Sequence, residues 1–391
     1  MTREDVLNDV LTLKGDNWLL ELPTGFGKSK LAIEKAKQYK ATNILLVVNR
    51  NVHKENWEQE FNKWWKNRKV TITKTTYVSL PKYKGTYDFC IMDEAHHLSE
   101  RCREALCDFN IKHCILLSAT VKKELKDSLN EVFGNLTIYT KTLRSAITND
   151  ILPDPKVYLI RLQLDNYFNT ETIVRNPKAK GTPIKISWKD RHKYSKIKKH
   201  PVIIYCTPKN YLEDSDNQIE YWKNVYLNIH RNSAKNMWLS LCSKRLRWLS
   251  DKKTPYIITL LKYLDNYRTL TFCNNITQTE LLGKYCINSK NKDSIQNLEL
   301  FNNHNIDHIT ACNILNEGMN LIDCQVGVYA NLNSSDTIIK QRIGRLLRHP
   351  KPVVIIPYYA NTRDEELVHK MMEDYNKDLI ISTDDYKNIR I

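Results

Sequence analysis

The sequence predicts an α/β protein with two parallel-sheet domains and an accessory insertion between them. In residues 1–150, short apolar runs alternate with helix-like segments, which is the rhythm of a parallel sheet covered by helices. The same alternation returns in residues 255–391. In residues 151–254 it is lost, and six prolines interrupt the chain. We interpret this middle part as a linker enlarged by an insertion.

The expected elements follow from apolar runs and their periodicity. In the first region the strands expected are Trp18–Leu22, Ile44–Val48, Asp88–Met92 and Cys114–Leu117, with a helix over Lys28–Tyr39. The middle region contains a strand-like run at Val157–Leu164 and helical sequence around Ile219–Trp248. The last region is expected to form a helix over Tyr256–Tyr267 and strands at Thr269–Cys273, His308–Cys312, Gly327–Ala330 and Val353–Pro357.

Composition narrows the class of protein. With 391 residues, 41% hydrophobic and 27% charged, the chain is long and apolar enough for two folded domains. No apolar run approaches the roughly 18–20 residues that cross a bilayer, and the N-terminus does not resemble a signal peptide. We therefore expect no membrane contact, and a location in the cytoplasm or nucleus. The ten cysteines are dispersed without any Cys-x-x-Cys pair, which favours reduced thiols and no structural zinc.

The charge predicts a polyanionic partner. The formal net charge is +16, and residues 175–200 alone contribute +9, with ten cations and a single acid, Asp190. Trp188 and Tyr194 lie among these cations, a mixture that can hold phosphates and stack bases. The alternative is a solvated surface loop. Sequence-independent nucleic-acid contacts are predicted at Arg191, Lys193, Lys196, Lys198 and Lys199.

A phosphate-binding loop is predicted where the first strand meets the first long helix. The run Pro23-Thr24-Gly25-Phe26-Gly27-Lys28-Ser29 lies between them. Its two glycines allow backbone N–H groups to turn inward, and the helix N-terminus faces the same negative charge. Lys28 would reach the β- and γ-phosphates of ATP, and the Ser29 hydroxyl would bind Mg²⁺. Leu22 replaces the usual leading glycine of the motif.

Two carboxylates complete the predicted chemistry. Asp93 and Glu94 directly follow the apolar run Phe89–Met92. A carboxylate at the end of a buried strand beside the phosphate loop suits Mg²⁺, which assigns Asp93 to the metal. Glu94 would orient and deprotonate the attacking water. An acidic helix start is the simpler alternative, and the phosphate loop upstream makes it less favoured.

Four motifs carry a resemblance to the superfamily 2 helicases. They are PTGFGKS, DEAH at residues 93–96, Ser118-Ala119-Thr120, and the run Gln341 to Arg348. Their order and approximate spacing over residues 22–348 resemble that family. The resemblance implies two RecA-like domains with ATP between them, and Ser118-Ala119-Thr120 as a coupling motif. It also implies that Gln341, Arg345 and Arg348 approach the nucleotide, the two arginines as arginine fingers. The alternative is a basic helix face on nucleic acid.

Further positions match the family less specifically. The resemblance places Asn49, Arg50, Thr76 and Asn274 on the nucleic-acid backbone, and Glu317 and Gly318 near ATP. The chain has the DEAH motif but no glutamine motif before the phosphate loop. It resembles compact phage- or virus-encoded DNA repair helicases and, over Lys244–Lys253, Swi/Snf-like translocases. A monomeric DNA helicase or translocase is therefore expected, with an RNA helicase or an ATP-gated nucleic-acid clamp as alternatives.

Overall fold

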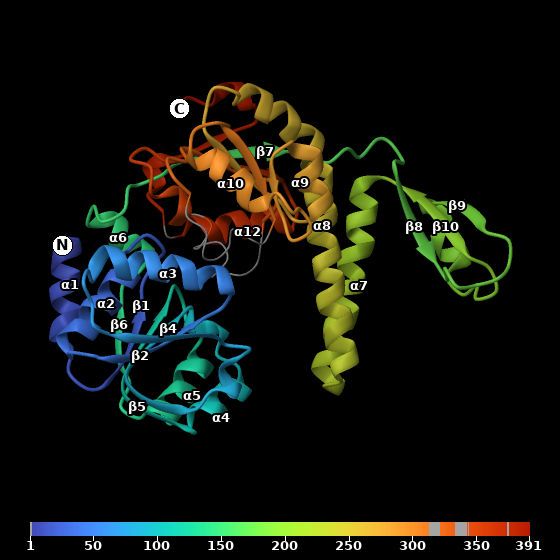
Figure 1. Ribbon diagram of the computed structural model, residues 1–391. Coiled ribbons are helices and arrows are strands. Elements are labelled where there is room, and N and C mark those ends of the chain that lie inside the picture. The colour runs from blue at the N-terminus through green and yellow to red at the C-terminus, as the bar shows by residue number, and fades with distance from the viewer. Residues whose placement is uncertain (1, 313–320, 333–341, 343, 374) are drawn as a thin grey trace.

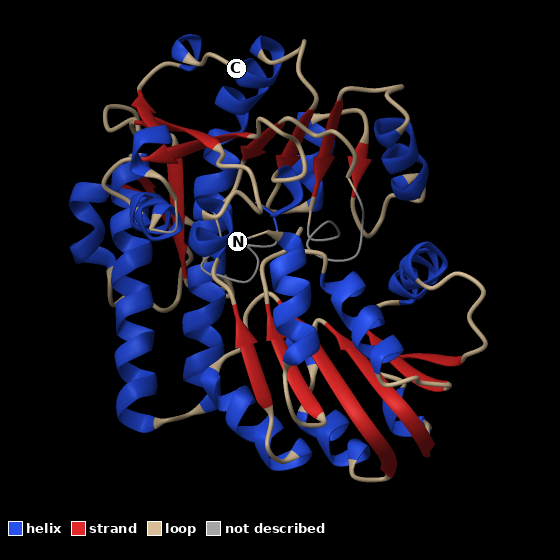
Figure 2. Ribbon diagram, turned by 90° about the vertical axis from the view of Figure 1, so that its left-hand side faces the viewer, coloured by secondary structure: helices blue, strands red, loops and turns tan. Residues whose placement is uncertain are grey.

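Each of the two predicted α/β regions forms one sheet with helices on both faces (Figure 1). The structure is a computed structural model, and it describes residues 2–312, 321–332, 342, 344–373 and 375–391. Every strand pair described in these two sheets is parallel. The predicted fold class is therefore confirmed. Figure 2 shows the two sheets one above the other, and we call them the first and second lobes.

The first lobe has six strands in the order β3-β2-β4-β5-β1-β6. Its central strands are fully buried runs of Ile, Leu, Val and Cys, as expected where helices cover both faces. Helices α1, α2 and α3 pack on one face, and α4 and α5 on the other. The strands are β1 (Asn17–Glu21), β2 (Asn43–Val48), β3 (Thr71–Thr76), β4 (Gly85–Asp93), β5 (Phe109–Ser118) and β6 (Thr137–Thr140). The helices are α1 (Arg3–Thr12), α2 (Lys28–Gln38), α3 (Asn51–Trp64), α4 (Glu100–Leu106), α5 (Lys123–Phe133) and α6 (Leu143–Thr148).

The second lobe has seven strands in the order β12-β13-β11-β14-β15-β7-β16. Helices α8 and α9 cover one face of this sheet, and α10 and α12 cover the other. The strands are β7 (Lys156–Leu162), β11 (Thr269–Phe272), β12 (Cys286–Ile287), β13 (His308–Ala311), β14 (Val326–Tyr329), β15 (Val353–Tyr359) and β16 (Ile380–Thr383). The helices that lie wholly in this lobe are α9 (Ile276–Leu282), α10 (Ser294–Asn302) and α12 (Arg363–Met372).

The position of β7 differs from the sequence interpretation. The run Val157–Leu164 was expected in the linking region, within 151–254. In the structure β7 lies between β15 and β16, with seven residue pairs joining it to β15. The chain thus enters the second lobe at residue 156, so the insertion interrupts that lobe instead of separating two domains.

The insertion contains a small sheet and a long helical hairpin. The sheet has the order β8-β10-β9, formed by β8 (Glu171–Arg175), β9 (Ile184–Ser187) and β10 (Val202–Cys206). It has a hydrophobic core of its own, composed of Ile173, Ile186, Val202, Ile204 and Cys206. Helices α7 (Pro208–Ile229) and α8 (Asn232–Tyr263) form the hairpin. In Figure 1 the small sheet and the hairpin project away from the two lobes.

Helix α8 crosses the boundary expected between residues 254 and 255. It includes Pro255, although proline in a helix interior removes a backbone hydrogen bond. Burial of the flanking turns compensates. The Lys253 ammonium lies 2.8 Å from an Asp364 carboxylate oxygen on α12, both fully buried. Leu249, Ile257 and other apolar side chains of α8 are also buried in the second lobe. Tertiary packing therefore overrides the local proline signal.

All ten cysteines are unpaired, and most are buried. Among the residues described, no helix combines the length and the apolar character needed to span a bilayer.

Candidate functional site

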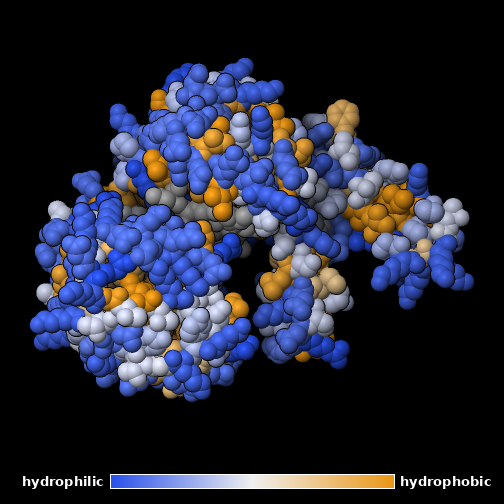
Figure 3. Space-filling view, in the orientation of Figure 1, coloured by the Kyte–Doolittle hydropathy of each residue, from blue (hydrophilic) through white to orange (hydrophobic). Residues whose placement is uncertain are grey.

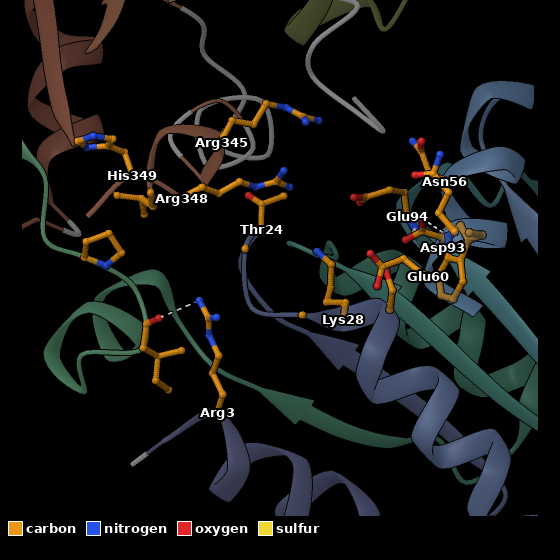
Figure 4. Close-up of a pocket in the computed structure, with 18 of the residues that line it drawn as sticks. Arg3, Thr24, Lys28, Asn56, Glu60, Asp93, Glu94, Arg345, Arg348 and His349 are labelled. Atoms are coloured by element: carbon orange, nitrogen blue, oxygen red, sulfur yellow. Dashed lines mark hydrogen bonds between the residues drawn. The ribbon is translucent and has the colours of Figure 1, made fainter. Parts of the chain in front are cut away.

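A pocket of about 720 Å³ lies where the two lobes meet (Figure 4). Residues of the phosphate loop, α3 and the end of β4 line it from the first lobe, and Arg345 and residues 347–350 line it from the second. The segment that leads into β7 closes one side. The lining residues are Arg3, Thr24, Gly25, Gly27, Lys28, Ser29, His53, Asn56, Trp57, Gln59, Glu60, Asp93, Glu94, Asp150, Ile151, Pro153, Arg345, Leu347, Arg348, His349 and Pro350.

The phosphate loop turns through two left-handed glycines. Gly25 and Gly27 have φ angles of 88° and 87°, which only glycine adopts without strain. Helix α2 begins at Lys28, and its N-cap, Gly27, supplies no side-chain hydrogen bond. The first N–H groups of α2 therefore remain available for an anion. The Lys28 ammonium donates to the Leu22 carbonyl at 3.0 Å.

Not every residue of the loop motif lines the pocket. Thr24, Gly25, Gly27, Lys28 and Ser29 do, whereas Pro23 and Phe26 do not. Phe26 is 3% exposed and belongs to the core of the lobe. The phenylalanine side chain therefore anchors the loop from behind.

The two predicted carboxylates stand opposite the phosphate loop. The Trp57 indole N–H donates to Asp93 Oδ2 at 2.9 Å, and the Tyr77 hydroxyl donates to the Asp93 carbonyl at 2.7 Å. Burial and the neighbouring Glu94 raise the pKa of Asp93 to about 6. A bound cation would counter both causes and favour the carboxylate. The aspartate is thus held in a fixed orientation at a place where a positive ion is favourable.

Glu94 is the one strained residue of this pair. Its φ angle is 53°, in the left-handed region that non-glycine residues seldom occupy. The side chain is buried, and its Oε2 accepts no hydrogen bond, lying 3.4 Å from His96 Nδ1. Strain and an unsatisfied buried carboxylate oxygen at one position are typical of functional sites. In Figure 4, Glu94 points into the pocket.

A polar chain leads from Glu94 to the Ser118-Ala119-Thr120 motif. His96 Nδ1 lies 3.1 Å from the Ser118 hydroxyl, which donates to the Thr120 carbonyl at 2.9 Å. Ser118 and Ala119 are buried, and the motif does not line the pocket. His96 therefore links this motif to Glu94, which lines the pocket.

The second lobe brings two arginines to the same pocket. Arg345 and Arg348 both line it, and Figure 4 shows their side chains extending over the phosphate loop near Thr24. Arg345 is buried and Arg348 is exposed. Gln341, Glu317 and Gly318, also predicted to approach ATP, lie outside the described residues.

Gly344 of the second lobe lies in close contact with the phosphate loop of the first. A Cβ atom at this glycine would lie 2.0 Å from Thr24 Oγ1 and 2.6 Å from Thr24 Cβ. Only a residue without a side chain therefore fits against the phosphate loop. Arg345 and Arg348 follow Gly344 within four residues, so the contact helps to position both guanidinium groups.

Arg342, in the same motif, is directed elsewhere. Its side chain is buried and donates to Asn331 Oδ1 at 2.9 Å, and Asn331 Nδ2 lies 3.4 Å from Asn274 Oδ1. Asn274 is one of the predicted nucleic-acid contacts. A polar chain thus joins the motif that carries the pocket arginines to that predicted contact.

The remaining predicted nucleic-acid contacts are spread over two surfaces. On the first lobe Arg50 is exposed and Asn49 is half-buried, whereas Thr76 is only 9% exposed and donates to the Ser79 hydroxyl. On the insertion the basic residues Lys193, Lys196, Lys198 and Lys199 are exposed. The Arg191 guanidinium is instead stacked 3.9 Å from the centre of the Trp188 ring.

Sequence reasoning missed the contribution of α3. Trp57 is buried, binds Asp93 and lines the pocket together with Asn56 and Glu60. No motif marks these residues. The available signal was positional: α3 follows β2, and the carboxyl ends of parallel strands share one edge of the sheet, where this pocket lies. Arg3, which donates to the Ile151 carbonyl and lines the pocket, was also missed, because no motif marks it.

The residues present fit ATP and Mg²⁺. The pocket volume is in the range of sites for small organic ligands. Lys28, the uncapped start of α2 and the two arginines suit a triphosphate. The Ser29 hydroxyl and the Asp93 carboxylate supply the oxygen ligands that Mg²⁺ prefers.

Comparison with known proteins agrees with this geometry. Residues 252–350 match the family model described as helicase conserved C-terminal domain, and residues 4–79 match that of the type III restriction enzyme, res subunit. Comparison with curated proteins found no match.

Solved structures share the two-lobed fold. The helicase domain of Hef from Pyrococcus furiosus is 12% identical, over 94% of this chain and 97% of that one, with a TM-score of 0.54. S. cerevisiae Dbp5 bound to RNA and ADP BeF3 is 11% identical, over 97% of this chain and 88% of that one, with a TM-score of 0.54. A variant of Dbp5, also bound to RNA and ADP BeF3, has a TM-score of 0.59 and is 11% identical, over 98% of this chain and 90% of that one. At such identities the likeness shows two RecA-like domains; with the two family matches, it supports a superfamily 2 helicase.

Proposed function

We propose that this chain is an ATP-driven motor of superfamily 2 that moves along, unwinds or remodels DNA. The single observation that carries the proposal is the shared pocket. Lys28, Ser29, Asp93 and Glu94 line it from the first lobe, and arginines line it from the second. Because both lobes contribute residues to the pocket, its geometry changes when the lobes move apart. A motor requires such a coupling between domain movement and the nucleotide site.

The chemistry follows from the roles open to each side chain. Lys28 and the N-terminus of α2 would hold the phosphates, and Ser29 and Asp93 would hold Mg²⁺, which neutralises charge on the phosphate oxygens. Glu94 would take the proton of the attacking water. The two guanidinium groups would stabilise charge at the γ-phosphate only while the lobes are in contact. Binding of ATP would therefore favour the closed arrangement, and hydrolysis would remove that preference.

Several observations support nucleic acid as the track. The chain has a net charge of +16, and the exposed lysines of the insertion lie on a surface separate from the pocket. Such cations favour binding that does not depend on base sequence and weakens steeply with salt. The preference for DNA rests on the resemblance to repair helicases and translocases. RNA is the second candidate, because a structural neighbour is described as bound to RNA.

Two further properties belong to the proposal. The ten unpaired cysteines suit a reducing compartment, which favours the cytoplasm or nucleus. We also propose that the monomer is active, because one chain supplies both halves of the pocket.

The experiment is an ATP hydrolysis assay across duplex DNA, single-stranded DNA and RNA. Stimulation by DNA above RNA supports the proposal, and stimulation by RNA alone favours the RNA alternative. Lys28→Ala and Glu94→Gln should each abolish turnover, while Glu94→Gln retains ATP binding. A strand-displacement assay beside a triplex-displacement assay separates unwinding from translocation on duplex DNA. ATP-dependent binding without displacement in either assay would indicate a clamp.

A further inference from the structure

The far end of the α7–α8 hairpin exposes an unusual set of apolar side chains. We define the hairpin tip as residues 221–239, which comprise the last turns of α7, the turn at His230 and Arg231, and the first turns of α8. At the tip Tyr221 is 61% exposed, and Leu227 and Ile229 are each at least half exposed. Met237 and Leu239 on α8 are also exposed. These side chains do not contribute to the hydrophobic cores of the lobes.

Aromatic rings support this apolar surface from within. Tyr226 of α7 stacks on Trp238 of α8, with ring centroids 6.1 Å apart, and His230 meets the edge of Tyr226 at 6.0 Å. The Lys235 ammonium lies 5.7 Å from the centre of the Tyr226 ring. The turn itself is tight, because His230 adopts a left-handed conformation at φ 54°. The cluster fixes the two helices to each other, so the exposed Ile229 is held at a rigid apex.

Charge around the tip has one sign. From Tyr221 to Ser250 the sequence contains no Asp or Glu, whereas it contains Lys223, Arg231, Lys235, Lys244, Arg245 and Arg247. The acidic residues of the hairpin lie outside this stretch: Glu213, Asp214, Asp216 and Glu220 precede it on α7, and Asp251 follows it on α8. Asp214 binds Arg175, and Asp216 binds Arg245. Positive charge beside exposed apolar groups is complementary to a polyanion that carries flat apolar rings.

The placement of the tip suits such a partner. In Figures 1 and 2 the hairpin extends from the second lobe to the level of the first lobe. Figure 3 shows open space between the hairpin and the first lobe in that view.

We propose that the hairpin tip is a nucleic-acid contact that takes the junction at which a duplex opens into single strands. Ile229 and Leu227 insert against the last stacked base pair, in the way that Ile, Leu and Met side chains enter base steps in other proteins. Arg231 and Lys235 bind the flanking phosphates. This inference rests on the proposed function, because it assigns the substrate structure that the motor engages.

The test uses the full chain and a partial-duplex DNA with 2-aminopurine, a fluorescent base whose emission rises on unstacking, at the junction. The wild-type protein should raise this emission without ATP. The double variant Leu227→Ser and Ile229→Ser should lose the rise, and its affinity for the junction should fall by about 10- to 150-fold, the range expected for the burial of one Leu or Ile side chain. The variant should keep the circular dichroism of the wild type and its ATP turnover without DNA. A matched control is the pair Leu281→Ser and Ile295→Ser, equally exposed on the second lobe, which should behave as wild type.

Two results would overturn the inference. One is an unchanged junction signal and affinity in the tip variant. The other is a lower sedimentation coefficient for the tip variant than for the wild type, both measured without DNA, because this would identify the tip as a contact between protein copies. The proposed function is tested separately. Lys28→Ala reports on the ATP site without any effect on the junction signal, whereas the tip variant reports on the junction without any effect on turnover in the absence of DNA.

Discussion

Substitution of Gly344 by alanine tests whether contact between the lobes is needed for catalysis. The added Cβ would lie 2.0 Å from Thr24 Oγ1, 2.6 Å from Thr24 Cβ and 3.1 Å from the Thr24 carbonyl oxygen. Rotation of the threonine side chain relieves the first contact. It does not relieve the other two, because the backbone fixes both atoms. Since Gly344 does not occupy the left-handed region, alanine introduces a clash without backbone strain.

The size of the effect follows from the cost of overpacking. An extra methyl group at a close contact typically costs about 1–3 kcal/mol. The phosphate loop has little freedom to retreat, because the Leu22 N–H donates to the Ser118 carbonyl and Phe26 is buried in the core. The cost therefore falls on the contact between lobes. We expect kcat/KM for ATP to fall by about 5- to 150-fold, since 1.36 kcal/mol corresponds to a factor of ten in rate.

Steady-state ATP hydrolysis measures this loss, and thermal melting shows whether the lobes stay folded. Gly283→Ala is the matched control. It adds a methyl group to the same lobe, where the Cβ would meet Thr310 Cγ2 at 2.9 Å, and Gly283 does not line the pocket. Normal kcat/KM in a folded Gly344→Ala protein would refute the reasoning. So would an equal loss in both variants.

Three other substitutions address single interactions. Arg348→Ala should lower ATP hydrolysis by about 10³-fold or more with little change in nucleotide affinity; unchanged single-turnover rates would contradict the arginine-finger role. Trp57→Phe keeps the ring but removes the N–H that binds Asp93, so the Mg²⁺ concentration for half-maximal turnover should rise about 10-fold or more, and an unchanged Mg²⁺ titration would dismiss the contact. Lys35→Met should lower the free energy of unfolding, measured by urea denaturation, by about 1–3 kcal/mol, because the buried ammonium donates to three carbonyls in the last turn of helix α1 and just after it. The exposed Lys66→Met serves as its control, and equal stabilities would disprove this role.

The elements nearest the pocket were the most predictable from sequence. The strands expected to end at Leu22, Val48, Met92 and Leu117 each end within one residue of that position, because each contains an apolar run buried on both faces, whereas β5 begins five residues earlier than expected. The phosphate loop at Lys28 and the carboxylates after β4 could be predicted from the strand and helix sequences directly beside them. β3 and β6 were not expected, since their threonine-rich sequences lack a continuous apolar run.

Long-range pairing could not be read from the chain. β7 pairs with β15, about 200 residues away in sequence, and nothing in the run Val157–Leu164 specifies that partner. The continuity of α8 through Pro255 depends on burial of Lys253 and its neighbours, which local propensity does not reveal. Trp57 was missed because its role depends on a long-range hydrogen bond from α3 to Asp93 at the end of β4.

The two halves of helix α8 have different surroundings, because most of its buried residues lie in the C-terminal half. Its C-terminal half is fixed in the second lobe, and its N-terminal half, from Asn232 to Trp248, extends outward over about 25 Å at 1.5 Å per residue. A rigid rod anchored in this way acts as a lever. If the second lobe rotated by about 15°, an angle known for subunit rotations, the free end would move by about 6–7 Å. That displacement is close to two nucleotide spacings along a strand, at about 3.4 Å each. Events at the γ-phosphate would thereby be amplified into steps of nucleotide size.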